Sequence, residues 1–483
     1  MSAELVVVEP RSVTPAVAPH GSLRLLLALA DADDDDDAAI AGALRVLLVA
    51  GGGALAADEP LDLASIDRRL VAIDRGIAGV LDAILHHPAL QALEARWRGL
   101  RFVVDRVDAG ENIVVEILDA SKEDLRLDFE ESPELAHSGL HAHVYTRALA
   151  TYGGHPYGLL CADFDVTPAA DDLALLRACA AVAALAHVPF VANAGVEFFG
   201  VRSLAELPGL GDLGAHFEGP HFAAWQRLRR EPFARYLGLC APRFLLRAPY
   251  NVECAPATPL RYREGLGDGD AALVWGHASL AFAVRVAAAF ARFRWCVEIL
   301  GSRACPGITT PDAGLSAPID GPWIPCPIEA LVSRRLQEDL TEAGLIALTY
   351  DRRAATLSFD VAPSLFRDEG PCPISGQLPY VFLAGRIAHY LKRIQRDTIG
   401  TWEDTRALHH LLDAWLRRYV ADVDDPHWET RVRRPFRRAA LTLDPHPRKE
   451  GWVACHLDLE PHLTHNGAPI VLAIVGRLDR GPA

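Results

Sequence analysis

The chain has 483 residues, of which 50% are hydrophobic and 23% charged, a mixture typical of a globular protein with two or three well-buried domains. Its formal net charge of −15 argues against a general nucleic-acid-binding protein, because contacts to phosphate groups need a basic surface. The nine cysteines form no C-x-x-C pair, and the chain has neither a basic leader nor an apolar run of about 18 residues. We therefore expect reduced thiols, no membrane span and a cytoplasmic location.

Residues 1–63 are expected to form a flexible arm with short helices. Leu23, Leu26 and Leu27 follow a potential N-cap, Ser22, at helical spacing. The aspartates Asp33–Asp37 repel one another, which predicts a solvated tether behind this helix. An apolar helix on a tether is suited to a groove on another protein, and the alternative is that it docks on its own domain.

Residues 64–375 are expected to form the body. Pro88 suits the first turn of a helix, which makes Leu81–His87 a separate short helix before it. Gly99 is expected to end the second helix. The predicted buried face of that helix has apolar residues at helical spacing, namely Leu90, Leu93, Trp97 and Leu100.

The next segments have the character of strands. Residues 101–107 and 112–118 are apolar and flank the turn sequence Asp108-Ala-Gly110, so we expect a hairpin buried on both faces. Residues 157–163 and 189–193 are also strand-like, and a strongly apolar helix over 170–187 separates them. This order predicts a βαβ unit with two parallel strands.

Acidic and amide side chains lie at the ends of these two strands. Asp163, Asp165 and Asn193 occupy positions where α/β enzymes hold their catalytic groups. A cytosolic α/β enzyme that uses Asp163 and Asp165 is therefore one functional hypothesis. No glycine-rich loop, lysine or nucleophile elbow accompanies these residues, and the histidines lack metal-ligand spacing. The sequence accordingly predicts no catalytic residue, no cofactor and no metal site.

Residues 376–483 are expected to form a separate C-terminal region. Its helix Leu408–Val420 ends near Arg417 and Arg418, within a segment from 386 to 438 that holds twelve basic and eight acidic residues. Residues 452–460 alternate between apolar and polar side chains, which predicts a half-buried strand flanked by strands at 439–443 and 470–476.

The last of these strands is apolar on both faces. Its apolar residues are Ile470, Val471, Leu472, Ile474 and Val475. A terminal strand of this kind can be donated to the sheet of a neighbouring molecule, and the alternative is that it closes its own sheet.

Several segments together resemble one family. The string Ile84-Leu-His-His-Pro88, followed by Gln91, Leu93-Glu94 and Trp97-Arg-Gly-Leu100, closely resembles the signature of the large sheath subunit of type VI secretion systems, the TssC/VipB family. Further similar segments include Ser121–Leu125, Gly376–Tyr380 and Gly476–Asp479. The resemblance extends from about residue 64 to the end of the chain.

The resemblance implies a mixed α+β, multi-layer contractile-sheath fold that a small partner subunit completes and that carries a C-terminal strand arm. It implies a structural protein, in an obligate heterodimer with the small sheath subunit, that polymerises with neighbouring protomers around an inner tube protein and contracts to propel it. A baseplate and an AAA+ disassembly ATPase are further implied partners, whereas nucleic acid and membrane are not.

The same resemblance suggests roles for three groups of residues. The helix with Leu23, Leu26 and Leu27 occupies the place of the family's ATPase-recognition helix but lacks its acidic pair. Arg417 and Arg418 are candidates to face the tube, and residues 470–475 are candidates to interlock protomers.

Overall fold

The computed structural model describes residues 63–250, 262–267, 269–301, 307–309, 326–367, 376–397, 405–423, 426–445, 452–462 and 472–479. These residues divide into two units, one formed by residues up to 87 together with 249–267 and the other by residues 88–248 and 268–483. The helix predicted around Leu23, Leu26 and Leu27 lies outside the described residues.

The first unit is built on helix α3, Leu63–Leu85. Asp82 near its end accepts hydrogen bonds from the Tyr262 hydroxyl at 2.6 Å and the Gly265 amide at 3.1 Å. Residues 81–85 are thus the last turns of a 23-residue helix, and the prediction of a separate short helix there was wrong.

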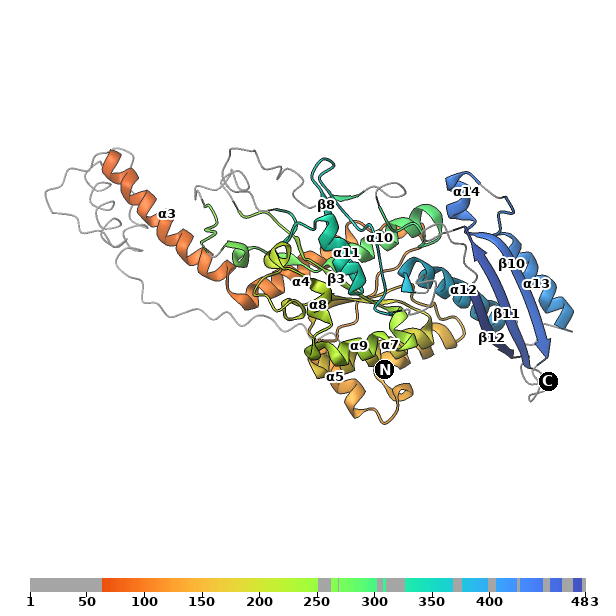
Figure 1. Ribbon diagram of the computed structural model, residues 1–483. Helices are drawn as coiled ribbons and strands as arrows, with labels where there is room; N and C mark the ends of the chain where they lie inside the picture. Colours follow the sequence, from red (N-terminus) through yellow and green to blue (C-terminus); the bar gives the residue numbers. More distant parts are fainter. Residues whose placement is uncertain are drawn as a thin grey trace, which may run out of the picture. The chain divides into compact units, whose positions relative to one another are not determined.

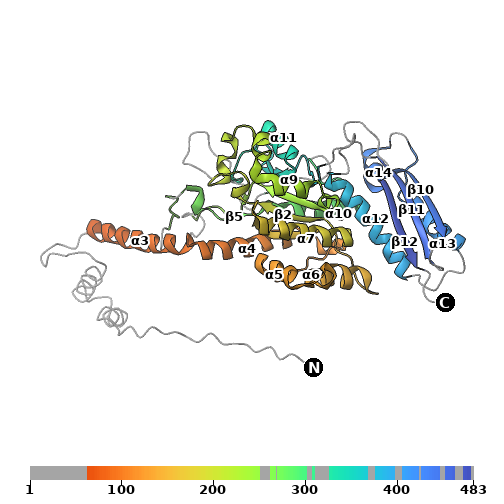
Figure 2. The same ribbon diagram turned by 60° about the horizontal axis from the view of Figure 1, so that its bottom comes forward.

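The centre of the second unit is a parallel four-stranded sheet in the order β1-β2-β3-β7. Its strands are β1 Leu160–Val166, β2 Phe190–Ala194, β3 Leu237–Ala241 and β7 Leu345–Ala347. Helix α7, Ala170–Ala186, connects β1 to β2. The predicted βαβ unit is confirmed, and α7 lies along β2 (Figure 2).

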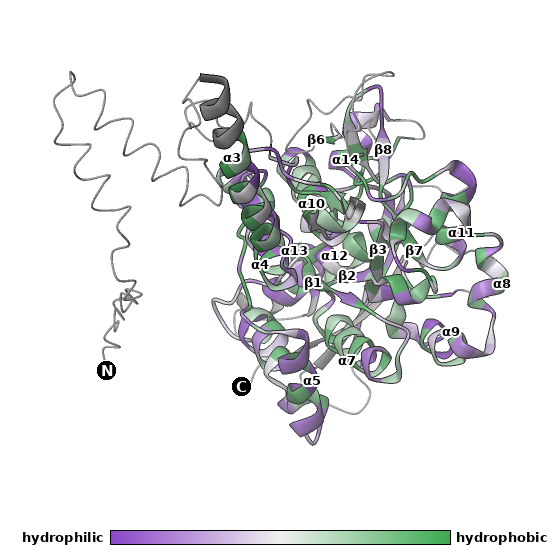
Figure 3. Ribbon diagram, turned by 90° about the vertical axis from the view of Figure 1, so that its left-hand side faces the viewer, coloured by the Kyte–Doolittle hydropathy of each residue, from purple (hydrophilic) through white to green (hydrophobic). Residues whose placement is uncertain are grey.

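Helices cover both faces of this sheet. Phe190, Ala192 and Ala194 of β2 belong to one buried cluster, whose helical residues include those of α7. Val191 points to the opposite face, where its cluster includes α10, Ala278–Phe293. Figure 3 shows α10 as largely hydrophobic, in contrast to the mixed surfaces of α5 and α9. The sheet is therefore the middle of three layers.

Helix α4, Pro88–Val104, begins at the predicted proline but presents a different face to the core. Trp97 is 65% and Leu93 51% exposed, whereas Gly99, Phe102 and Val103 are buried. A Cβ atom on Gly99 would come within 2.6 Å of the Leu280 Cδ1 atom, so this glycine allows α4 to approach α10 closely. The prediction that Leu93 and Trp97 are buried was wrong, and so was the prediction that Gly99 ends the helix.

The predicted hairpin over 101–118 is absent from the structure. Residues 101–104 are the last turn of α4, and Ala109–Glu111 form a short 3₁₀ helix, η1. Residues 112–120 are without regular structure and most of them are exposed. The β-branched residues 103 and 104 are helical because Phe102 and Val103 are buried in the cluster that also contains α10.

The other elements surround these layers. The remaining helices of four or more residues in the body are α5 Lys122–Glu131, the π-helical turn Ala142–Ala150, the 3₁₀ segment Leu204–Gly209, α8 Leu213–Phe217, α9 Ala223–Arg229, the 3₁₀ segments Pro232–Tyr236 and Gly269–Ala272, and α11 Arg334–Glu342. The short strands are β4 Phe244–Leu245, β5 Trp275–Gly276, β6 Ile308–Thr309, β8 Thr349–Asp351 and β9 Thr356–Ser358. α9 ends at Arg229, and β3 begins at Leu237.

The C-terminal region is an antiparallel sheet with helices on one face (Figure 1). Its elements are α12 Leu378–Asp397, α13 Thr405–Arg417, α14 Trp428–Arg433, β10 Phe436–Pro445, β11 Trp452–Pro461 and β12 Leu472–Asp479. Cys455, Leu457 and Leu459 are buried with residues of α12 and α13, whereas His456 and Asp458 are exposed. The alternation predicted for this strand is confirmed at these positions.

Candidate functional site

The acidic strand-end residues Asp163 and Asp165 lie against a histidine from a distant part of the sequence, His277. Asp163 Oδ1 lies 2.7 Å from Nδ1 of His277, and Asp165 Oδ1 lies 3.3 Å from Nε2 of the same ring. His277 is the N-cap residue of α10, directly after β5. Two carboxylates of β1 thus hold one imidazole at the beginning of α10.

Charge pairing keeps this imidazole protonated. Burial alone would lower the pKa of His277, but the hydrogen bonds and the charges of Asp163 and Asp165 outweigh it and raise the pKa to about 9. Burial would likewise raise the pKa of Asp165, but the hydrogen bond to His277 and the nearby charges of Arg243 and Lys122 lower it. The group is therefore an ion pair at neutral pH.

Asn193, the third predicted strand-end residue, is buried and fully engaged. Its Oδ1 accepts the amide hydrogen of Ser279 at 2.9 Å, and its Nδ2 donates to the Ser279 hydroxyl at 3.0 Å. Asn193 therefore fixes the first turn of α10 to β2, which is a structural task.

The surrounding charges are also paired with one another. Lys122 Nζ donates to Asp172 at 2.6 Å and to the Asp165 carbonyl at 3.0 Å. Arg243 binds Glu329 through two nitrogens, at 2.7 and 2.8 Å. These contacts neutralise the charge near the strand ends and attach α5 to β1.

This arrangement does not favour His277 as a general base. Both ring nitrogens of His277 face carboxylates, and a cation with a pKa of about 9 cannot accept a proton at neutral pH. A pocket of about 400 Å³ lies elsewhere, and its lining includes none of Asp163, Asp165 and His277. Within the described ranges, no group of three or more His, Cys, Asp or Glu side chains could hold a metal ion. The chemistry of the cluster is that of an internal clamp.

Similarity to known proteins gives the decisive observation about function. A family model described as EvpB/VC_A0108, tail sheath N-terminal domain, matches residues 67–366, and a second, described as EvpB/VC_A0108, tail sheath gpW/gp25-like domain, matches residues 368–478. The chain belongs to the tail sheath family of type VI secretion systems. The type VI secretion system sheath protein TssC1 of Pseudomonas aeruginosa (strain PAO1) is 28% identical to it over 435 residues, which cover 86% of each chain.

The predicted TssC/VipB resemblance is thereby confirmed, and the chain is a large subunit of a contractile sheath. Membership implies co-assembly with a small sheath subunit and with further sheath protomers. The family is structural, and none of these similarities supports the enzyme hypothesis based on Asp163 and Asp165. Among the helices in the described ranges, none is long and apolar enough to cross a membrane.

The structure places part of the strand that was predicted to link sheath protomers. β12 pairs with β11 in antiparallel register, with Ile474 opposite Leu457 and Val475 opposite His456. Ile470 and Val471 lie outside the described residues. Within the described strands, β12 and β10 are the two edges of the C-terminal sheet, so this sheet can accept a further strand.

The two candidate tube-facing arginines of this sheath subunit lie at the end of α13. The Arg417 side chain is 77% exposed, and its Nε atom lies 2.7 Å from Asp413 on the same helix. Arg418 is exposed in the turn that follows α13. Both guanidinium groups are accessible to a binding partner.

Proposed function

We propose that this chain acts as half of an obligate heterodimer with the small sheath subunit. These heterodimers polymerise in the cytoplasm around an inner tube protein, and contraction of the polymer drives the tube outward. Tail sheath family membership carries this proposal, because the two family models match residues 67–366 and 368–478, which include most of the body and of the C-terminal region. In this function the chain has no catalytic role, and the clamp at His277 maintains the fold.

In this proposal, three regions of the chain have different roles. Residues 1–63 form the arm that the AAA+ disassembly ATPase recognises through Leu23, Leu26 and Leu27. Residues 64–375 form the sheath body, and residues 376–483 form the inner layer of the sheath. The baseplate is a further partner of the assembled sheath. Support for the last division is that α13, β10 and β11 are buried in a third hydrophobic cluster, which α12 and the body residues Trp295 and Val297 join to the rest of the chain.

Within the inner layer, the β12 strand links neighbouring protomers and Arg417 and Arg418 face the tube. Residues Ile470, Val471, Leu472, Ile474 and Val475 supply the linking strand, which fits the open edges of the described C-terminal sheet. Exposed ion pairs are weak, so Arg417 at the end of α13 and Arg418 directly after it suit a contact that must break when the sheath expands.

Co-expression with the small sheath subunit tests the heterodimer. We expect the two chains to co-purify in equal amounts through size-exclusion chromatography, and the large chain alone to aggregate or remain insoluble, because an obligate interface buries more than about 2,000 Å² of largely apolar surface. A stable, soluble monomer that does not bind the small subunit would contradict the proposal.

A further inference from the structure

The segment between η1 and α5 is extended and unpaired in this chain. Within the described ranges, the backbone groups of residues 113–119 bond to no strand, and the backbone hydrogen bond found there joins the Ala120 amide to the Leu118 carbonyl at 2.9 Å. The segment nevertheless has the sequence Ile-Val-Val-Glu-Ile-Leu over 113–118, which has a high β-propensity. Free N–H and C=O groups on such a strand are a template for an added strand.

Both faces of the segment are apolar and open to solvent. Val114 is 79%, Val115 42%, Ile117 68% and Leu118 49% exposed. Since successive side chains of a strand point to opposite faces, Val114 and Leu118 lie on one face and Val115 and Ile117 on the other. This pattern is typical of a strand inside a layered structure, and the described part of this chain does not supply the covering layers.

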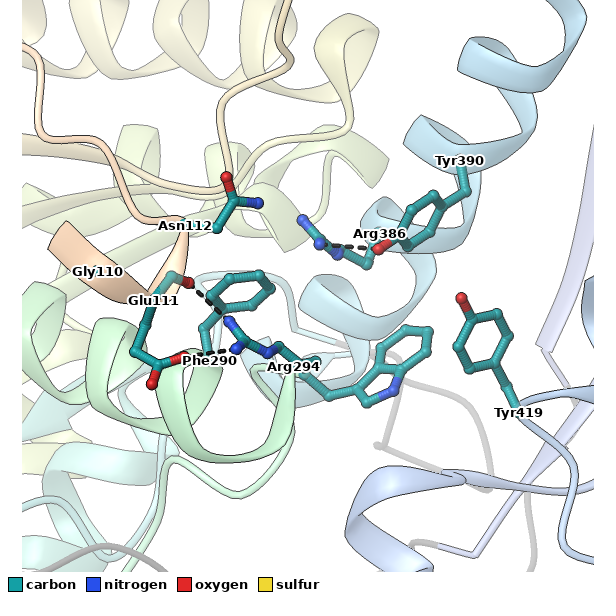
Figure 4. A pocket seen from close by; sticks show the side chains of 9 residues that line it. Gly110, Glu111, Asn112, Phe290, Arg294, Arg386, Tyr390 and Tyr419 are labelled. Carbon is teal, nitrogen blue, oxygen red and sulfur yellow. Dashed lines mark hydrogen bonds and ion pairs between the residues drawn. The ribbon is translucent and has the colours of Figure 1, made fainter. Parts of the chain in front are cut away.

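Contacts at both ends hold the segment extended. On one side, Arg294 binds the Glu111 carbonyl at 2.7 Å and also its carboxylate, and the next residue, Asn112, lines the pocket formed with Arg386 and Tyr390 (Figure 4). On the other side, Ser121 begins α5 with a capping box. Because the ends are fixed, a binding partner loses less free energy in ordering the segment.

The Glu116 side chain is also held in place. Its carboxylate accepts a hydrogen bond from the Tyr157 hydroxyl, and this hydroxyl lies 2.9 Å from Nε2 of His143. The acidic side chain in the middle of the apolar sequence therefore has partners within this chain. The four exposed apolar side chains remain available.

Exposed apolar residues are concentrated around this segment. Of the 17 large hydrophobic residues that are exposed in the described part of the chain, seven lie between positions 93 and 118. They are Leu93, Trp97, Val104, Val114, Val115, Ile117 and Leu118. Exposed apolar side chains in this number, four of them consecutive around Glu116 and three on α4, indicate surface that another protein covers.

We propose that the small sheath subunit adds a β-strand to residues 113–118 and covers the exposed face of α4. This inference rests on the proposed heterodimer and specifies where it forms. Tail sheath family membership implies co-assembly with a small sheath subunit, which is a folded partner of the size that two apolar strand faces and a helix require. A second copy of the chain and residues 1–62 are the alternative occupants, and the cross-linking experiment below distinguishes them from the small subunit.

Two variants test the proposal in co-expressed complexes. The double substitution Val114→Lys/Ile117→Lys places a charge on each face of the strand, and Val115→Pro removes one backbone donor while it fits an extended backbone. We expect each variant to reduce the amount of co-purified small subunit at least tenfold. Tyr152→Lys, at an apolar side chain that is 80% exposed, is the matched control and should leave co-purification unchanged.

A measurement that leaves the surface intact identifies the occupant. With a photoreactive benzoylphenylalanine at position 114 of the co-expressed large chain, mass spectrometry should find cross-links to the small subunit. Cross-links to residues 1–62 of the same chain or to a second copy would overturn the proposal, as would normal co-purification of both variants. If the unmodified chains fail to co-purify, the heterodimer itself is contradicted, whereas failure of the variants alone to respond contradicts only this location.

Discussion

At the scale of single residues, His277 shows how a polar cluster at a strand end can serve the fold. Its ring joins Asp163 and Asp165 of β1 to the beginning of α10. Asp163, which makes the shorter contact, lies 114 positions away from His277 in the sequence. From the sequence alone, both aspartates are candidate catalytic residues. No local pattern identifies the histidine that pairs with them. The residue that determines their role is identified only by the fold, which brings the beginning of α10 next to β1.

The first prediction concerns the pH dependence of stability. The pKa of His277 is raised from 6.5 to about 9, so its stabilisation is complete below about pH 6.5 and is lost as the pH rises through about 9. The depressed pKa of Asp165 acts in the other direction, and its contribution is lost only in acid. We expect His277→Gln to lower the free energy of unfolding by about 2 kcal/mol at pH 7 and by much less at pH 10.

Denaturant unfolding at the two pH values checks this, with the purified heterodimer as the sample. Equal destabilisation at pH 7 and pH 10 would mean that the His277 charge does not contribute.

The second prediction concerns the contact between α4 and α10. Gly99→Val should lower the free energy of unfolding by about 1–3 kcal/mol, because a Cβ atom there comes within 2.6 Å of the Leu280 side chain and the added methyl groups overpack the contact. Gly79→Val in α3, where no atom lies within 4 Å, is the control and should be nearly neutral. The shift in the denaturation midpoint measures both, and a similar loss at both sites would contradict the packing explanation.

At the scale of elements, the periodic patterns of segments that this chain buries predicted the secondary structure correctly. The apolar patterns of segments that remain exposed did not. The predictions of the βαβ unit and of the alternating strand β11 are confirmed, because this chain itself buries these periodic segments. Helix α4 has two apolar stripes, one with Trp97 and one with Phe102, and periodicity cannot tell which stripe meets its own core. The sequence at 113–118 is strand-like, but the described part of the chain offers it no strand to pair with, so the predicted hairpin is absent.

The third prediction concerns β12. Truncation after Pro469 removes the strand that pairs with β11, and we expect it to abolish sheath polymers, because the strand then cannot link protomers. Negative-stain microscopy of the co-expressed subunits measures this. Retained pairing with the small subunit without polymers would assign the strand to protomer linkage, whereas loss of pairing would assign it to the core; persistent polymers would show that neither role is needed.

At the scale of the whole molecule, the chain combines a self-contained core with surfaces that it does not cover. Three hydrophobic clusters bury the central sheet and the C-terminal sheet, whereas the stretch from Leu93 to Leu118 exposes seven large apolar residues. Charge is also distributed unevenly along the chain, because residues 386–438 carry more basic than acidic residues although the net charge is −15. Such asymmetry is expected of a subunit that is completed by assembly.

The fourth prediction uses this charge distribution. The double charge reversal Arg417→Glu/Arg418→Glu should weaken retention of the tube within the sheath several-fold, because like charges would then meet at the proposed contact. Arg334→Glu/Arg335→Glu on α11 is the matched control, since both side chains are exposed and lie near acidic residues four positions later. Tube protein that co-sediments with the polymer is the quantity to measure, and equal retention by all three forms at low and high salt would place Arg417 and Arg418 on a merely solvated face.

The most direct test of the central claim is electron microscopy of the chain co-expressed with the small sheath subunit. A contractile-sheath large subunit predicts hollow tubular polymers when both subunits are present and none when either is omitted. Discrete particles from the two subunits together, with the large chain stable and soluble by itself, would contradict the account.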